Sequence, residues 1–165
     1  MRRKDREVTN PEEIMDIIQK CDLCRLAYVD DGMPYVIPMF YGYTFIDNTL
    51  TLYFHCANEG RQINIIKKNP SVCFEIDCVN IHVANQNGYQ LMLESVVGNG
   101  IISFVTDRKD KKSAIATIIK RHSYIHSQYA TKLLTDKRID GVTILKVVVN
   151  EFSGKRYLRH DYNQV

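Results

Sequence analysis

The residues from Leu52 to Gln62 carry the strongest chemical signal in this sequence. An apolar, strand-like run ends at His55, a short turn that contains Gly60 follows, and Arg61 stands where a helix is expected to begin. The first N–H groups of a helix have no partner within the helix, and the helix dipole places partial positive charge there. Because arginine adds a full charge and glycine permits close backbone approach, this segment is suited to hold a phosphate group.

His55 admits two interpretations. A histidine at the end of a strand is commonly a structural or solvent-exposed residue. Beside Gly60 and Arg61, it is also a candidate for a residue that contacts a bound ligand, and both interpretations stay open. The sequence contains neither a Gly-x-Gly-x-x-Gly motif nor a Walker loop, so residues 55–62 are the best phosphate cradle that it offers.

Other arrangements of reactive residues favour a structural role. Cys21 and Cys24 have the spacing of a redox or metal site, but no second pair accompanies them, so we interpret them as packed thiols. The remaining histidines form no ligand cluster, and no metal site is predicted. Ser95 lies within a strand pattern and lacks the Gly-x-Ser-x-Gly elbow of a hydrolase.

Composition and charge limit the class of protein. A length of 165 residues suits a single domain, residues 1–165, whose core needs no metal or disulfide. A net charge of +3 is too small to argue for nucleic acid, and no such partner is predicted. No stretch resembles a signal peptide or a membrane span, so no membrane association is predicted. Five cysteines without a secreted-type framework favour reduced thiols and a cytoplasmic location.

Periodicity and turn signals predict the elements that must position residues 55–62. Strands are expected over residues 25–29, 35–43, 49–55, 71–77, 90–105 and 141–149, and helices over residues 11–20, 59–68, 107–121 and 127–134. Residues 80–88 are expected to form a loop. Pro38 predicts an edge strand or a bulge, and Gly98 and Gly100 predict a bulge or bend. About six strands with helices between them, without β-α-β alternation, favour an α+β, barrel-like sheet.

Five motifs in order resemble one known family. They are Arg25-Leu-Ala, Asp31-Gly-x-Pro-Tyr-Val-Ile-Pro-Met39, Leu52-Tyr-Phe-His-x-Ala-x-Glu-Gly-Arg61, Asn69-Pro-x-Val-x-Phe-Glu75 and Glu94-Ser-Val-Val-Gly98. From about residue 12 to residues 153–155, the sequence is similar to the nitroimidazole-resistance (Nim) branch of the pyridoxamine 5′-phosphate oxidase-like flavoproteins. The resemblance implies an α+β fold, the FMN-binding split β-barrel with flanking helices. It also implies a homodimer with two FMN sites at the subunit interface.

The same resemblance implies the residues of the FMN site. The cofactor-binding residues that it implies are Val36, Ile37, Pro38, Met39, His55, Ala57, Gly60, Arg61, Gln62, Ser95 and Val96. The strand over residues 36–39 would lie along the isoalloxazine ring, and Arg61 and Gln62 fall where relatives place a basic pair on the phosphate. His55 is the implied catalytic residue, which would orient a substrate or donate a proton. Gln62 departs from the family, in which a lysine is usual, so one cation is lost.

The function that the resemblance implies is that of an FMN-dependent oxidoreductase. Electrons would pass from a reduced nicotinamide or another donor, through the flavin, to a small electron-poor acceptor such as a nitroaromatic compound. An alternative is a non-catalytic module in which the same barrel binds or senses a flavin or haem. Nucleic-acid binding through the basic helix at residues 109–121 is a third, remote alternative.

Overall fold

The computed structural model describes residues 2–83, 88–122 and 135–162. Its strands form one antiparallel sheet of eight strands in the order β3-β2-β6-β7-β8-β5-β4, with the short β1 paired to β8. The strands are β1 (Glu7–Val8), β2 (Leu23–Asp30), β3 (Met33–Phe40), β4 (Gly42–Ile46), β5 (Thr49–Cys56), β6 (Ser71–Val83), β7 (Gly88–Val105) and β8 (Thr143–Tyr162). The helices of the described part are η1 (Lys4–Arg6), α1 (Pro11–Lys20), α2 (Arg61–Lys68), α3 (Arg108–Arg121) and α6 (Asp136–Asp140).

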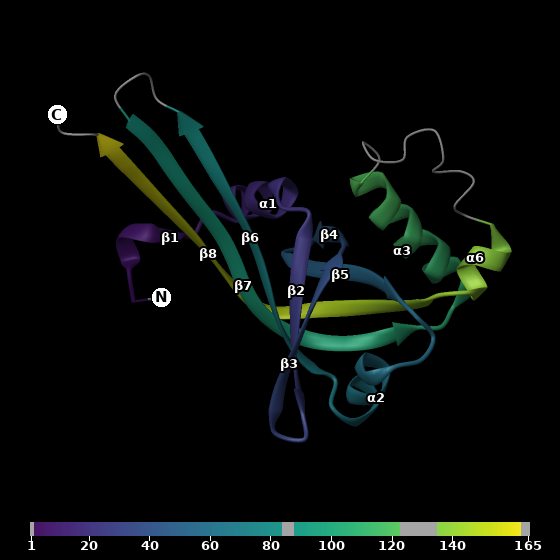
Figure 1. The fold of residues 1–165 in the computed structure, drawn as a ribbon. Coiled ribbons are helices and arrows are strands. Elements are labelled where there is room, and N and C mark those ends of the chain that lie inside the picture. Colours follow the sequence, from purple (N-terminus) through teal and green to yellow (C-terminus); the bar gives the residue numbers. More distant parts are fainter. Residues whose placement is uncertain (1, 84–87, 123–134, 163–165) are drawn as a thin grey trace.

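The long strands β6, β7 and β8 form the centre of the sheet, and shorter strands flank them on both sides (Figure 1). β3 and β5 contact each other although four strands lie between them in the sheet order, so the sheet curls around its own core. α3 lies on β4 and β5, and α2 lies against β2 near the turn of the β2–β3 hairpin (Figure 1). The candidate phosphate cradle is therefore next to an edge of the sheet.

Helix α1 closes one side of the core. The sequence predicts a cap at Asn10 and an apolar stripe of Ile14, Ile17 and Ile18, and all three isoleucine side chains are buried. Asn10 caps the helix, because its Oδ1 accepts a hydrogen bond from the backbone N–H of Glu12 at 2.9 Å. Burying one such isoleucine stabilises the fold by about 1.5–3 kcal/mol relative to leaving it exposed. The predicted helix is confirmed.

Two side chains from other elements hold the C-terminal end of α1. The Tyr41 hydroxyl is shared between the carbonyls of Ile18, at 2.7 Å, and Cys21, at 2.9 Å. Arg121 of α3 donates from Nη2 to the same two carbonyls, at 2.6 and 2.5 Å. Its guanidinium carbon lies 4.4 Å from the centre of the Tyr41 ring. Because the last carbonyls of a helix lack partners within the helix, these contacts satisfy them and fasten α1 to α3.

The prediction that Cys21 and Cys24 are packed thiols is confirmed. Both are free cysteines that lie buried in the hydrophobic core, at the junction of α1 and β2. Burial raises the pKa of both thiols, so both remain protonated at neutral pH.

A buried carboxylate joins α1 to the centre of the sheet. Glu94 of β7 has no exposed surface, and it accepts hydrogen bonds from Arg156 Nε at 2.8 Å and Lys20 Nζ at 3.2 Å. Arg156 also donates to Glu13, at 2.7 Å. Burial alone would raise the pKa of Glu94, but the hydrogen bonds from Arg156 and Lys20 outweigh it and lower this pKa. The ionised carboxylate therefore ties the end of α1 to β7 and β8.

Two predicted strand boundaries differ from the structure. In both places, hydrogen bonding to a neighbouring strand extends the strand beyond the point at which the side-chain pattern ends. The predicted loop at residues 80–88 is wrong, since β6 continues to Val83 and β7 begins at Gly88, while residues 84–87 lie outside the described part. β8 continues to Tyr162, well beyond the predicted end at Val149. Both extensions pair with β7, and a strand that is paired in this way tolerates polar side chains.

The apolar run at residues 35–43 is divided between two strands, β3 and β4, with Tyr41 between them. This division and the unpredicted short strand β1 give the sheet eight strands where the sequence predicts about six. The predicted helix at residues 127–134 lies outside the described residues. None of the helices in the described ranges is both long and apolar enough to cross a bilayer.

The bulge predicted at Gly98 and Gly100 is confirmed. The pairing of β7 with β8 shifts register between Asn99 and Gly100. A Cβ on Gly98 would lie 2.6 Å from the Phe74 ring, so a side chain there would displace the core. These two glycines let β7 bend across the core while its pairing on both sides continues.

Candidate functional site

The N-terminus of α2 is open to solvent. The helix begins at Arg61, two residues later than the sequence predicts, and Gly60 precedes it with φ 132°. The first bond of the helix runs from Asn64 N to Gly60 O, at 3.2 Å, so the N–H groups of residues 61–63 have no partner within the helix. Gly60 provides no side-chain cap, and a Cβ placed on it would meet nothing within 4 Å. The backbone here leaves room for an anion.

Arg61 lies beside this open helix end and is held by two residues of the β2–β3 hairpin. Its Nε donates to Asp30 Oδ2 at 2.8 Å. Its guanidinium carbon lies 4.4 Å from the centre of the Tyr35 ring, in the geometry of a cation–π contact. The Arg61 side chain is 54% exposed, whereas that of Asp30 is 20% exposed. The guanidinium is thus fixed along one edge and open to solvent elsewhere.

Gln62 points the opposite way, into the protein. The residue is 9% exposed, and its Nε2 donates to the Tyr28 hydroxyl at 2.8 Å and to Met39 Sδ at 3.3 Å. Burial raises the pKa of Tyr28, so its hydroxyl stays protonated. That Gln62 contacts the phosphate stays a prediction from resemblance. In the structure, its amide nitrogen instead fastens the first turn of α2 to β2 and β3.

The predicted ring-binding strand is an edge strand, as Pro38 indicated. Ile37 pairs with the buried Leu26, so its side chain faces the core, and the partly buried Met39 packs against the core cluster. Val36 and Pro38 face outward and are exposed. The four residues of this strand therefore divide between two faces, because strand side chains alternate.

Val36 begins a row of residues that crosses the outer face of the sheet. It pairs with Ala27 of β2, and Ala27 pairs with Cys73 of β6. Cys73 pairs in turn with Asn99 of β7, and Asn99 pairs with Glu151 of β8. Residues that are paired across antiparallel strands project to the same face. The outer face thus runs continuously from β3 to β8.

The two predicted residues of β7 also lie on opposite faces. Ser95 pairs with Asp77 and Lys155 on the outer face and is partly buried. Val96 is completely buried in the core. Ser95 is consequently available to a ligand on the outer face, whereas Val96 supports the sheet from behind.

His55 and Ala57 are exposed at the end of β5. His55 pairs with Ile144 of β8, and no hydrogen bond links it to another predicted site residue in the described part of the chain. In the sheet order, β5 and β3 stand on opposite sides of the central strands. The curl of the sheet nevertheless brings β3 and β5 into contact, and Arg61 lies against Tyr35 of β3.

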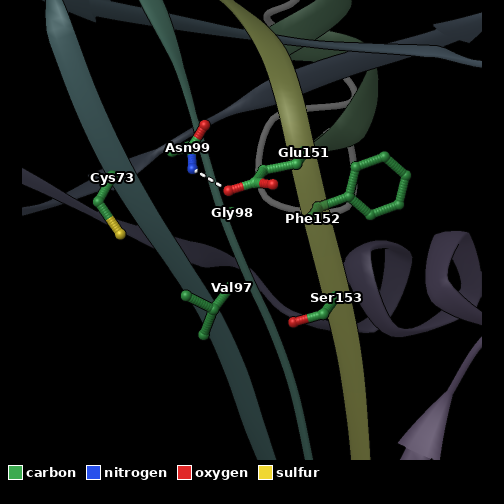
Figure 2. A pocket seen from close by; sticks show the side chains of 7 residues that line it. All are labelled: Cys73, Val97, Gly98, Asn99, Glu151, Phe152 and Ser153. Atoms are coloured by element: carbon green, nitrogen blue, oxygen red, sulfur yellow. Dashed lines mark hydrogen bonds between the residues drawn. The ribbon is translucent and has the colours of Figure 1, made fainter. Parts of the chain in front are cut away.

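A hollow of about 330 Å³ lies on the outer face where β7 bends. Figure 2 shows the side chains of Cys73, Val97, Asn99 and Glu151 around it, and Asn99 Nδ2 donates to Glu151 Oε1 at 2.6 Å. Sequence reasoning missed this hollow, although Gly98 and Gly100 signalled the bend that creates it. It also missed the contacts of Asp30 and Tyr35 with Arg61, because both residues lie far from Arg61 in the sequence.

Comparison with known proteins identifies the fold. The family model described as pyridoxamine 5′-phosphate oxidase matches residues 10–156. A candidate 5-nitroimidazole antibiotic resistance protein from Bacteroides thetaiotaomicron is 29% identical, with a TM-score of 0.75 over 94% of this chain and 89% of that chain. Comparison with curated proteins gives no sequence match.

More distant structures share the fold alone. An FAD-binding protein from Mesorhizobium loti is 20% identical, with a TM-score of 0.62 over 90% of this chain and 96% of that chain. An FAD- and haem-binding protein from Mycobacterium smegmatis is 15% identical, with a TM-score of 0.72 over 91% of this chain and 72% of that chain. The α+β split-barrel fold that the sequence predicts is confirmed. The chain belongs to the pyridoxamine 5′-phosphate oxidase family.

Proposed function

We propose that this protein binds FMN on the outer face of its sheet and is an oxidoreductase for small electron-poor acceptors. The observation that carries the proposal is the pairing of an uncapped helix N-terminus with the exposed guanidinium of Arg61. Backbone N–H groups and an arginine fork are the donors that a phosphate prefers. Proteins of the same fold that are described as FAD-binding support a flavin as the bearer of that phosphate.

The residues near Arg61 fit the rest of a flavin. β3 is an edge strand, so every second backbone N–H and C=O group points away from β2 without a partner strand. These groups are suited to bind the polar edge of the isoalloxazine ring. Val36 and Pro38 supply exposed apolar surface for the face of the ring. When bound, the flavin supplies the electron transfer, and the protein supplies position and a partly dry surface.

A homodimer would complete the site. The outer face carries exposed apolar side chains, at Val29 (54%), Val36 (54%), Val97 (44%), Ile101 (44%) and Val148 (39%). Contiguous exposed apolar surface commonly marks an interface. A second copy that packs on this face would cover these side chains. We propose that His55, which is exposed at the end of β5, orients the acceptor or donates a proton beside the bound flavin.

The first test is a titration of the purified protein with FMN, followed by absorbance and size measurements. We expect one FMN per chain, a dimeric species, and much weaker binding of riboflavin, which lacks the phosphate. A protein that ignores FMN, or that binds riboflavin equally well, would contradict the proposed phosphate site.

A second measurement separates an enzyme from a module that only stores or senses flavin. We expect the FMN-loaded protein to oxidise a reduced nicotinamide faster when a nitroaromatic compound is added, and to reduce that compound. Binding of FMN without acceptor-dependent turnover, tested with more than one electron donor, would favour the non-catalytic alternative.

A further inference from the structure

Arg61 has a defined orientation before any ligand is present. Asp30 Oδ2 accepts a hydrogen bond from Nε of the guanidinium, at 2.8 Å. The Tyr35 ring lies against the face of the guanidinium, with its centre 4.4 Å from Cζ. An arginine has five N–H donors in a rigid plane. Among the described residues, no further hydrogen bond or ion pair involves Arg61, so the edge formed by Nη1 and Nη2 remains free. Two parallel donors on that edge match the spacing of two phosphate oxygens.

The residues that orient Arg61 are themselves fixed. The rings of Tyr28 and Tyr35 lie 6.4 Å apart, and the Tyr28 hydroxyl binds Gln62, the neighbour of Arg61 in α2. Asp30 is the last residue of β2, and its carboxylate is mostly buried. Together with the contact of Gln62 with Met39, the hairpin and the first turn of α2 are thus joined at four points. A flexible arginine is thereby held in one arrangement, which reduces the conformational entropy lost when an anion binds.

We propose that Asp30 is a positioning residue for the phosphate site. It accepts the Nε–H of Arg61 and so directs the Nη1/Nη2 edge toward the open N-terminus of α2, with Tyr35 as the supporting surface. This inference rests on the proposed function. A carboxylate next to a phosphate site would ordinarily weaken phosphate binding by charge repulsion. Here the orientation that Asp30 gives to Arg61 outweighs that repulsion.

Two substitutions at one position separate orientation from charge. Asp30→Ala removes both the carboxylate and the hydrogen bond, whereas Asp30→Asn removes the charge and keeps an oxygen that can accept the Nε–H. We expect Asp30→Ala to raise the dissociation constant for FMN about tenfold, as the loss of one well-oriented charged contact does. Asp30→Asn should bind FMN within about twofold of the wild type. Neither variant should alter the binding of riboflavin.

Asp31→Asn is the matched control. It removes the same charge one residue away, where Asp31 pairs with Lys68 at 3.4 Å rather than with Arg61. Asparagine also tolerates the positive φ of 49° at this position. We expect this variant to bind FMN as the wild type does. Thermal unfolding of each variant verifies that the fold is retained, and Asp30→Ser, whose hydroxyl is too short to reach Nε, replaces Asp30→Ala if that variant does not fold.

The possible results separate the role of Asp30 from the existence of the FMN phosphate site itself. If both Asp30 variants bind FMN more tightly than the wild type, Asp30 competes with the phosphate and the inference is wrong. Unchanged FMN binding in Asp30→Ala would equally overturn it. If instead Arg61→Ala binds FMN as well as the wild type does, the phosphate site itself is misplaced, and the proposed function fails before the role of Asp30 is reached.

Discussion

Two arginines of this protein stack on tyrosine rings at the same distance but have different surroundings. Arg121 lies 4.4 Å from the centre of the Tyr41 ring, and Arg61 lies 4.4 Å from that of Tyr35. Arg121 donates to the backbone carbonyls of Ile18 and Cys21 and to the Tyr41 hydroxyl. Arg61 donates to Asp30 alone among the described residues.

The two arginines differ in how many of their N–H donors already have an acceptor within the protein. Around Arg121, the protein itself provides the acceptors, because helix α1 ends there with carbonyls that need partners. Around Arg61, the neighbouring helix begins, so the nearby backbone groups are donors too, and the first turn of α2 contains no acidic side chain. An arginine at a helix C-terminus is thus suited to structure, whereas one at an open N-terminus is suited to an anion.

The largest effect is expected for Arg121→Ala. This change leaves the carbonyls at the end of α1 without their charged donor and removes the contact with the buried Tyr41 ring. We expect the free energy of unfolding to fall by about 2–4 kcal/mol, measured by urea denaturation. A loss below about 0.5 kcal/mol would mean that the contacts are not stabilising and would remove one side of the comparison.

Glu94→Gln extends the comparison to a buried ion pair, with an expected loss of about 1–3 kcal/mol at pH 7. Hydrogen bonds from Arg156 and Lys20 lower the pKa of Glu94 below its ordinary 4.5 despite burial. A carboxyl whose pKa is lower when folded stabilises the fold above pH 4.5 and loses this contribution as the pH falls through the folded value. Unfolding experiments from pH 7 to pH 3 should therefore show the wild type and Glu94→Gln converging in acid. A constant difference across this range would contradict the assignment.

Gln62→Leu tests the position at which the resemblance implies a lysine. Leucine keeps much of the volume but loses the hydrogen bonds to Tyr28 and Met39, which leaves the Tyr28 hydroxyl without that donor. We expect a loss of about 1–2 kcal/mol in unfolding free energy, with FMN affinity changed less than about threefold. If the affinity falls tenfold or more while stability is kept, Gln62 turns outward to bind the phosphate, as the resemblance implies.

The smallest effect on stability is expected for Arg61→Ala, the counterpart of Arg121→Ala. Its side chain is 54% exposed, so its contacts are weakened by solvent, although Asp30 is only 20% exposed. Unfolding free energy should therefore change by less than about 1 kcal/mol. FMN affinity should nevertheless fall by about tenfold or more, measured by quenching of flavin fluorescence. Equal losses of stability for both arginines would break the comparison, because they would make Arg61 a structural residue as well.

Local signals predicted the elements around the site well. The cap at Asn10, the isoleucine stripe of α1, the edge position of the strand with Pro38 and the bulge at Gly98 and Gly100 all depend on neighbouring residues or on single-residue geometry. The strand extensions after Asp77 and Val149 were missed, because β7 supplies their hydrogen bonds from a distant part of the sequence. Pairing of that kind leaves little trace in side-chain alternation.

The sequence by itself determined the chemistry that is available: an arginine and a glycine at a helix start, a histidine at a strand end, and a family resemblance in the right order. Tertiary structure decided how each residue is used. It turned Gln62 inward and Arg61 outward, and it placed Asp30 and Tyr35 against the guanidinium. The physical reason is that a side chain's direction, burial and partners depend on contacts between residues that lie far apart in the chain, as Asp30 and Arg61 do.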